Sequence, residues 1–159
     1  MPHPPNPVYL RRAVELAAQN ARAGAGGPFA ALIVRDGEVI AEAANSVTTT
    51  NDPTAHGEIN AIRKACAALG AFSLAGCEIY SSCEPCPMCL AAIYWARLGA
   101  IYFGSSQQDA AKAGFDDAFL YEEFRKSNQN RSIPSVQLLQ SEAWEAFATW
   151  QSISTKVDY

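Results

Sequence analysis

Two cysteines one helical turn apart constrain this chain more than any other feature. Cys86 and Cys89 stand at the start of an apolar run that has the spacing of a helix. Pro85 and Pro87 suit the turn that enters a helix, where the missing N–H of proline costs nothing. At a helix N-terminus the two thiols point the same way, and the positive end of the helix dipole lowers their pKa toward the thiolate. The pair therefore predicts a metal site, with zinc as the ion that thiolates favour.

A histidine and a glutamate upstream extend this pattern. His56 supplies a neutral imidazole, and three protein ligands leave the fourth tetrahedral position of zinc open for water, as in catalytic sites. Water bound there loses a proton near neutral pH and becomes a hydroxide nucleophile. Glu58 is near enough to take that proton and to pass it to a substrate and then to a leaving group. The order His-x-Glu followed by Pro-Cys-x-x-Cys is typical of zinc nucleobase deaminases.

The same residues also allow two structural interpretations. Cys83 lies three residues before Cys86 and would serve as a fourth ligand, which would close the site around a structural zinc. That arrangement would leave Glu58 beside a metal with no open position. The other interpretation is a chance grouping of cysteines with no metal at all, although both halves of a long, spaced motif must then coincide.

Composition indicates a globular protein without a surface built for nucleic acid. The chain has 159 residues, and its net charge of −4 comes from interspersed acidic and basic residues with no basic cluster. A surface that follows a phosphate backbone needs a stripe of Lys and Arg, so nucleic acid is not an expected partner. Five cysteines, an odd number, without a secretory signal favour a reducing compartment over a disulfide framework. No stretch approaches the length of a membrane span, so no membrane partner is expected and we expect a cytoplasmic protein.

Helical and strand patterns alternate along the chain after an opening hairpin. Asp36-Gly37 is a strong two-residue turn signal between two β-rich runs. The expected strands are 29–35, 38–45, 77–81, 100–104 and 136–139. The expected helices with defined ranges are 8–22, 86–97, 120–126 and 142–151. Two more are expected: one that is entered at 53–56 and closed by Gly70, and one that ends at 113. This order predicts an α/β protein, a three-layer α/β/α fold with a five-stranded mixed sheet.

No linker or internal repeat divides residues 1–159, so a single domain is expected. Residues 1–7 contain four prolines and are expected to form a flexible leader. Residues 152–159, on their composition alone, have the character of a loose C-terminal tail.

Four segments carry a resemblance to a known family. They are Asn51–Glu58, Cys83–Cys89, Ala92–Arg97 and Gly114–Asp117. With these segments the chain resembles the cytidine deaminase-like superfamily of zinc nucleobase deaminases, and within it the compact bacterial guanine deaminases. The zinc motif specifies only the superfamily, whereas the Gly-Phe-Asp-Asp segment and the aromatic C-terminal end narrow the resemblance to the guanine type. The similarity runs from the first helix to Tyr159, which is nearly the whole chain.

The resemblance implies the metal ligands and the proton-transfer groups. It implies that His56, Cys86 and Cys89 hold one zinc ion per subunit. It also implies that Glu58 shuttles protons and that Asp117 assists proton transfer at the leaving amine. On the residues alone, a solvated loop acid is the alternative interpretation of Asp117.

The resemblance implies a purine site and a homodimer as well. Asn45 would hydrogen-bond the purine, Phe29 and Trp95 would sandwich its ring, and the backbone N–H of Gly57 would contact it. In this family the C-terminal segment crosses to the partner of a homodimer, where Tyr159 would help close the neighbour's pocket. On the residues alone, the alternatives are that the Asn45 amide caps a turn and that the two aromatic rings pack in the core.

Gly57 departs from the family pattern, which usually has alanine between the histidine and the glutamate. Glycine costs a helix roughly 1 kcal/mol relative to alanine. The backbone N–H survives the change, so the departure affects local rigidity and not the chemistry.

These implications lead to one expected reaction and three rivals. The expected reaction is hydrolytic deamination of guanine to xanthine and ammonia, in which zinc-bound hydroxide attacks C2 and Glu58 shuttles the protons. Guanosine deaminase is a close rival, because it shares the zinc site and a similar Gly-Phe-Asp-Asp segment. A tRNA adenosine deaminase shares the zinc motif but predicts a basic surface. A zinc-stabilised binding module is the alternative without enzyme activity.

Overall fold

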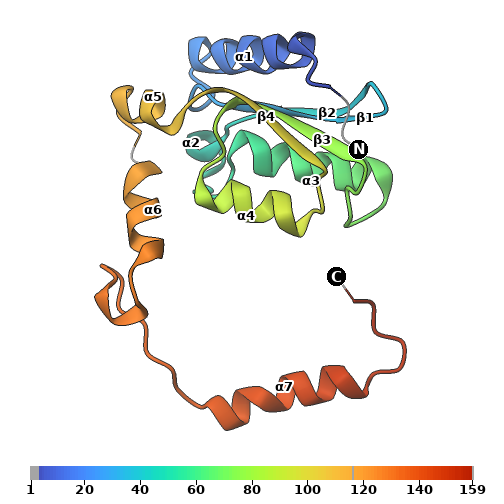
Figure 1. Cartoon of the computed structure of the whole chain (residues 1–159), viewed down its shortest axis with the longest axis vertical. Coiled ribbons are helices and arrows are strands. Elements are labelled where there is room, and N and C mark those ends of the chain that lie inside the picture. Colours follow the sequence, from blue (N-terminus) through green and yellow to red (C-terminus); the bar gives the residue numbers. More distant parts are fainter. Residues whose placement is uncertain (1–3, 116, 159) are drawn as a thin grey trace. The chain divides into compact units, whose positions relative to one another are not determined.

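A four-stranded mixed sheet lies at the centre of the larger of two units in the chain (Figure 1). The computed structural model describes residues 4–115 and 117–158, without the side chain of Asp117. The two units are Met1–Leu120 and Tyr121–Tyr159. The expectation that residues 1–159 fold as a single domain stays a prediction.

The sheet begins with the hairpin that the sequence predicts. β1 (Ala30–Arg35) and β2 (Glu38–Ala44) pair antiparallel. Asp36 and Gly37 have φ angles of +51° and +82°, the left-handed backbone of a type I′ turn that favours Asp-Gly. β3 (Cys77–Cys83) pairs antiparallel with β1, and β4 (Ala100–Ser105) pairs parallel with β3. The strand order is therefore β2-β1-β3-β4.

Between residues 4 and 113 the first unit contains five helices, and several of their ends show clear capping. They are α1 (Pro7–Arg22), α2 (Val47–Thr50), α3 (Gly57–Leu69), α4 (Pro87–Trp95) and α5 (Gln107–Lys112). Asn6 caps α1 by accepting a hydrogen bond from the Val8 N–H at 3.0 Å. Gly70 ends α3 with a φ of +61°, a backbone that suits glycine. No helix in the described part of the chain is both long enough and apolar enough to span a membrane.

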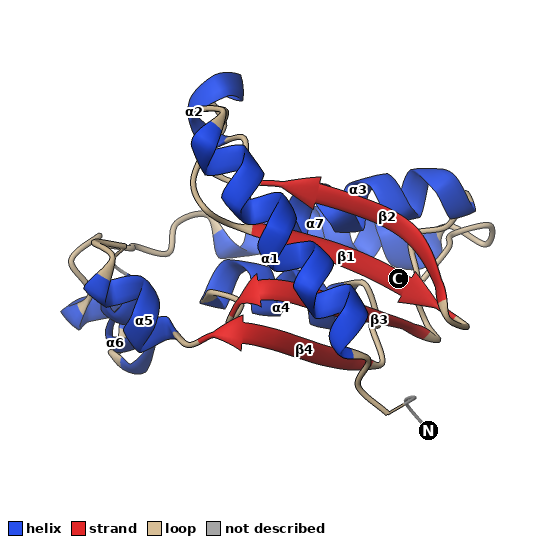
Figure 2. Ribbon diagram, turned by 90° about the horizontal axis from the view of Figure 1, so that it is seen from above, coloured by secondary structure: helices blue, strands red, loops and turns tan. Residues whose placement is uncertain are grey.

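Alternating side chains of β1 build a hydrophobic cluster on each face of the sheet. Leu32 and Val34 pack with Ala13 of α1 on one face. Ala31 and Ile33 pack on the other face in the cluster that includes buried residues of α3 and α4. Figures 1 and 2 show α1 over one face and α3 and α4 over the opposite face. The predicted three-layer arrangement is thus confirmed for this unit.

The predicted fifth strand does not form. Residues 136–139 join no strand, and the side chains of Val136 and Leu138 are 79% and 76% exposed. Leu139 has a φ of +53° and begins α7 (Gln140–Ser152). Pro134 lacks an N–H, and a run of four residues this close to a helix start has little length for a strand. The sheet of the described residues therefore has four strands and not five.

The rest of the chain is helical or irregular. α6 (Asp117–Arg125) is followed by a single 3₁₀ turn, Asn128–Asn130. Glu123 stabilises the return of the chain by accepting hydrogen bonds from the backbone N–H of Ser132 at 2.7 Å and from its hydroxyl at 2.9 Å.

Candidate zinc centre and active site

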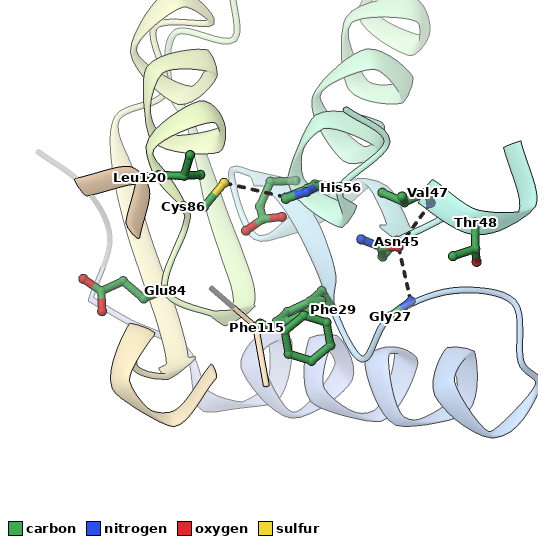
Figure 3. Close-up of a pocket in the computed structure, with 11 residues that line it drawn as sticks. Gly27, Phe29, Asn45, Val47, Thr48, His56, Glu84, Cys86, Phe115 and Leu120 are labelled. Atoms are coloured by element: carbon green, nitrogen blue, oxygen red, sulfur yellow. Dashed lines mark hydrogen bonds between the residues drawn. The ribbon is translucent and has the colours of Figure 1, made fainter. Parts of the chain in front are cut away.

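The N-termini of α3 and α4 converge on one point, and each carries predicted zinc ligands. His56 is the N-cap residue of α3, and Cys86 is the N-cap residue of α4. Cys89 lies in the first turn of α4. Figure 3 shows the thiol of Cys86 directed at the imidazole of His56. The fold therefore brings the three predicted ligands together from two helices that are remote in the sequence.

The ligand atoms have the spacing of a tetrahedral zinc site. The Nδ1 atom of His56 lies 3.6 Å from Sγ of Cys86 and 3.5 Å from Sγ of Cys89. Zinc with Zn–N bonds of about 2.05 Å and Zn–S bonds of about 2.3 Å separates tetrahedral nitrogen and sulfur ligands by about 3.6 Å. All three ligand atoms lie within 4.8 Å of one another. The geometry thus fits zinc held through Nδ1 and two sulfurs.

The electrostatics of the two thiols also suit a metal. A hydrogen bond from Cys89, followed by one from His56, lowers the pKa of the Cys86 thiol to about 4. The same hydrogen bond, together with burial, raises the pKa of the Cys89 thiol. The pair therefore loses one proton readily and holds the second strongly. A divalent cation that binds both sulfurs displaces this second proton.

Glu58 lies in the first turn of α3, beside the ligand cluster, and its side chain is buried. The hydroxyl of Ser81, in β3, donates a hydrogen bond to Oε1 of Glu58 at 3.1 Å. Burial raises the pKa of the Glu58 carboxyl above its usual value. A raised pKa makes this carboxylate a better proton acceptor than an exposed glutamate, which suits a proton shuttle.

A cavity of about 390 Å³ opens over this cluster. Its volume is in the range typical of small-molecule sites. Residues that line it and matter for the chemistry are Phe29, Asn45, His56, Glu58, Cys86 and Phe115. One cavity therefore holds two of the ligand residues, the proposed proton shuttle, and both aromatic and amide groups.

The side chain of Asn45 presents a hydrogen-bond donor to this cavity. Its Oδ1 atom accepts hydrogen bonds from the backbone N–H groups of Gly27 and Val47, each at 3.2 Å (Figure 3). Two N–H donors fix the orientation of the amide, since only its oxygen can accept from them. Its Nδ2 donates to none of the described residues. The amide N–H groups are thus available to a ligand that offers an acceptor.

Two aromatic rings form a wall of the cavity. The rings of Phe29 and Phe115 meet edge to face, with centroids 4.7 Å apart and an interplanar angle of 80°. Phe29 is a predicted site residue, whereas sequence reasoning did not single out Phe115. The Gly-Phe-Asp-Asp segment was the available signal, because Phe115 stands two residues before the acid that carries the family resemblance. Glu84 also lines the cavity and was not singled out.

Gly57 occupies a position where a side chain has no room. A Cβ atom at this residue would lie 2.8 Å from the Cα of Ala30 and 3.1 Å from its backbone nitrogen. The start of α3 therefore approaches β1 closely.

Among the described residues, the predicted site residue Trp95 is not brought into the cavity. Trp95 ends α4, is 63% exposed, and does not line the cavity. The guanidinium of Arg97 lies 5.8 Å from the centre of its ring. The side chain of Asp117 and the whole of Tyr159 lie outside the described residues.

Cys83 does not belong to the ligand cluster among the described residues. It ends β3 and pairs in register with Ser105 of β4. Its thiol lies 3.7 Å from the carbonyl oxygen of Ser106, to which it donates. This placement favours a zinc site with three protein ligands over a closed site with four.

The fold and the ligand cluster are those of a zinc-dependent deaminase, and comparison with known proteins shows the same. Residues 6–105 match the model for the cytidine and deoxycytidylate deaminase zinc-binding region, and the chain belongs to this family. It is 53% identical to a guanine deaminase from Bacillus subtilis over 152 residues, which cover 96% of this chain and 97% of that one.

Two further comparisons bear on the fold and on the reaction. The crystal structure of guanine deaminase from Bacillus subtilis matches with a TM-score of 0.95 at 51% identity, over 98% of this chain and 99% of that one. A tRNA-specific adenosine deaminase from Bacillus subtilis is 34% identical over 129 residues, which are 81% of this chain and 79% of that one. The scaffold is thus shared with enzymes that act on different bases.

Proposed function

We propose that this chain catalyses the hydrolytic deamination of guanine to xanthine and ammonia. The observation that carries the proposal is the cavity, which combines a zinc-type ligand set, the buried carboxyl of Glu58 and the amide donor of Asn45. The similarity to a guanine deaminase over nearly the full length of both chains supports the choice of base.

The residues of the site divide the chemistry between them. His56, Cys86 and Cys89 would hold zinc, which when bound lowers the pKa of a water molecule enough to make it a nucleophile near neutral pH. Glu58 takes a proton from this water and delivers it to N3 of the purine ring. It then takes the remaining proton from the new C2 hydroxyl and passes it to the departing amine, with help from Asp117. The oxygen of the water ends on C2 of the ring, and the amine leaves as ammonia.

The amide of Asn45 favours guanine over adenine. Guanine presents two acceptors, O6 and N7, on the edge where adenine presents the N6 amino donor beside N7. Two backbone N–H groups hold the Oδ1 atom of Asn45, so its Nδ2 atom is the donor that remains for a ligand. The amide cannot turn to offer an acceptor to the N6 amino group of adenine without losing those two hydrogen bonds. A site with this fixed donor therefore matches the O6 acceptor of guanine, where adenine presents a second donor.

Contacts with the faces and the remaining edge of the purine are part of the proposal. Phe29 packs on one face of the ring, supported from the side by Phe115. Gly57 contributes its backbone N–H, because the first N–H groups of a helix have no partner within the helix. Contact between Trp95 and the ring stays a prediction, since this residue does not line the cavity.

We also infer a homodimer in which residues 152–159 cross to the partner and Tyr159 closes the partner's pocket. α7 supports a role in association, because it exposes Trp144, Phe147 and Trp150 at 57%, 60% and 40%. Large exposed aromatic side chains grouped on one helix mark an interaction surface. Sedimentation of the purified protein tests this proposal, and a monomer at micromolar concentration would contradict it.

A cytoplasmic location and a role in guanine breakdown belong to the same proposal. Five cysteines without a disulfide bond suit a reducing compartment.

Ammonia release from zinc-loaded protein offered guanine, guanosine, adenine and cytosine in parallel tests the reaction. Release from guanine alone is the expected result. Release from guanosine would show that the cavity accepts a ribose and would replace the proposal by guanosine deamination. Adenosine in tRNA is a necessary fifth substrate, because the similarity to a tRNA-specific adenosine deaminase covers 81% of the chain. Turnover of the tRNA alone would overturn the proposal.

Replacement of Glu58 tests the proton shuttle. Glu58→Gln keeps the size of the side chain but cannot carry a proton, so turnover falls by about 10²–10⁴-fold while zinc content stays the same. Near-normal turnover would contradict the mechanism. Loss of zinc from the variant would assign Glu58 to metal binding instead.

A further inference from the structure

Glu84 links the metal-binding loop to the segment that forms the outer wall of the cavity. It lies between the end of β3 and Cys86, and its side chain accepts a hydrogen bond from the backbone N–H of Gln107 at 3.0 Å. Its own backbone N–H donates to the carbonyl of Ser105 at 2.8 Å. A single residue therefore holds both the end of β4 and the first residue of α5.

The segment that follows has few other attachments to the sheet. α5 has six residues, of which Ala110 alone is buried. A helix this short is unstable on its own, so its position depends on contacts at its two ends. At the far end the Phe115 N–H donates to the carbonyl of Ala110 at 3.1 Å, and the Phe115 ring packs on Phe29.

Two of the segment's attachments, through Glu84 and through Phe115, border the active-site cavity. Glu84 and Phe115, which hold opposite ends of the segment, both line the cavity (Figure 3). Loss of the Glu84 side-chain bond would remove the direct tie between the metal loop and the first residue of α5, and the bond from the Cys83 thiol to the Ser106 carbonyl would remain before the helix start. The Phe115 ring, which forms part of the cavity wall, would then no longer be held at a fixed distance from the ligand cluster.

We propose that Glu84 is a positioning residue, which fixes the segment 106–115 to the metal loop and thereby sets Phe115 against the substrate ring. The proposal rests on the proposed function for its substrate. Glu84 acts through Phe115 and neither binds the metal nor transfers a proton. Its effect therefore falls on substrate binding more than on the chemical step.

The test compares Glu84→Ala with Glu84→Gln in the zinc-loaded protein. In Glu84→Ala the bond to Gln107 is lost, and we expect the KM for guanine to rise about tenfold or more with a smaller change in kcat, as for loss of a hydrogen bond to a charged group. Glu84→Gln keeps an acceptor oxygen, so its KM stays within about threefold of the wild type. Zinc content stays the same in both variants. An unchanged KM in Glu84→Ala, or zinc lost from it, would overturn the proposal, as would equal losses in both variants.

Asp109→Ala is the matched control. Asp109 accepts hydrogen bonds at the same helix start, from the N–H of Ser106 at 3.0 Å and its hydroxyl at 2.8 Å, but it does not contact the metal loop. This change weakens α5 without breaking the link through Glu84, so the KM for guanine stays within about threefold. A rise equal to that of Glu84→Ala would show that helix stability alone matters and would overturn the proposal.

Two further measurements separate this proposal from the proposed function. Phe115→Leu combined with Glu84→Ala should raise the KM no more than the worse single change, because both act through one wall. Amide hydrogen exchange of residues 107–115 should accelerate in Glu84→Ala and not in Glu84→Gln. If the wild type does not deaminate guanine, the proposed reaction is overturned. The hydrogen-exchange data would still decide whether Glu84 holds segment 106–115. Unchanged exchange in Glu84→Ala would overturn the positioning role itself.

Discussion

The hydroxyl of Ser81 in β3 donates a hydrogen bond to the buried carboxyl of Glu58 at the start of α3, over 3.1 Å. This bond joins the sheet to the group that we propose as the proton shuttle. It also favours the charged form of Glu58 against the burial that disfavours it. The strand therefore holds the carboxyl in the direction of the cavity.

We expect Ser81→Ala to lower kcat for guanine about tenfold while zinc content stays the same, because the carboxyl loses the hydroxyl that anchors it to β3. Ser82→Ala is the matched control, since the next hydroxyl accepts a hydrogen bond from the Ala30 N–H at 3.0 Å and does not reach Glu58. The control should lose stability, through an unpaired buried N–H, and keep most of its kcat. Equal kcat losses in the two variants would contradict the assignment.

Gly57→Ala should destabilise the protein. The new Cβ would lie 2.8 Å from the Cα of Ala30, and overpacking of this kind costs about 1–3 kcal/mol. The gain in helix propensity is about 1 kcal/mol at most, so a net loss of about 1 kcal/mol remains, or about 2–4 °C in Tm. Gly99→Ala is the control, because its Cβ would meet only the Cys77 carbonyl at 3.5 Å, an ordinary contact. A Tm for Gly57→Ala equal to or above the wild type would show that β1 moves away at no cost.

Local signals in the sequence were enough to predict the ligand cluster and the opening hairpin. Both rest on short-range chemistry: thiols at a helix start in one case, and the left-handed backbone of Asp36 and Gly37 in the other. The same kind of signal failed at residues 136–139. An apolar run forms a strand only when a sheet edge lies close enough to pair with it. The local sequence does not show how far the run lies from such an edge.

Residues that act through the tertiary fold were beyond sequence reasoning. Ser81 lies in a fully buried strand, and nothing in its neighbours shows that it faces Glu58. In the sequence Glu84 belongs to the cysteine motif, whereas its hydrogen-bond partner, Gln107, follows a separate strand. Only the parallel register of β3 and β4 brings these residues together. Short motifs therefore predicted the reactive atoms but not the residues that position them.

The ion pair between α1 and β2 should make stability depend on pH in the acid range. Arg12 donates to both oxygens of Glu42, from Nε at 2.9 Å and from Nη2 at 2.6 Å. These hydrogen bonds lower the pKa of the Glu42 carboxyl below its usual 4.5. A lowered pKa in the folded state means that the stabilisation is present above the usual pKa and is lost as the pH falls through the lowered value.

The measurement is the difference in Tm between the wild type and Glu42→Gln, taken from about pH 7 to about pH 3. The wild type should be the more stable at the upper end, and its advantage should shrink toward the lower end. Both side chains are more than a third exposed, so added salt should reduce the advantage as well. An advantage that stays constant over the whole range would show that packing, and not charge, separates the two proteins.

Exchange of single cysteines for serine decides how many protein ligands the zinc site has. Cys86→Ser removes one of two sulfurs that face Nδ1 of His56, so zinc content should fall from about one per chain toward zero and activity with it. Cys83→Ser changes an equally small buried side chain that lies outside the cluster, and should keep both zinc and activity. Metal analysis and ammonia release on the same preparations provide the comparison. Loss of zinc from Cys83→Ser would establish a fourth ligand and leave no open position for water, which would favour a structural zinc over a catalytic one.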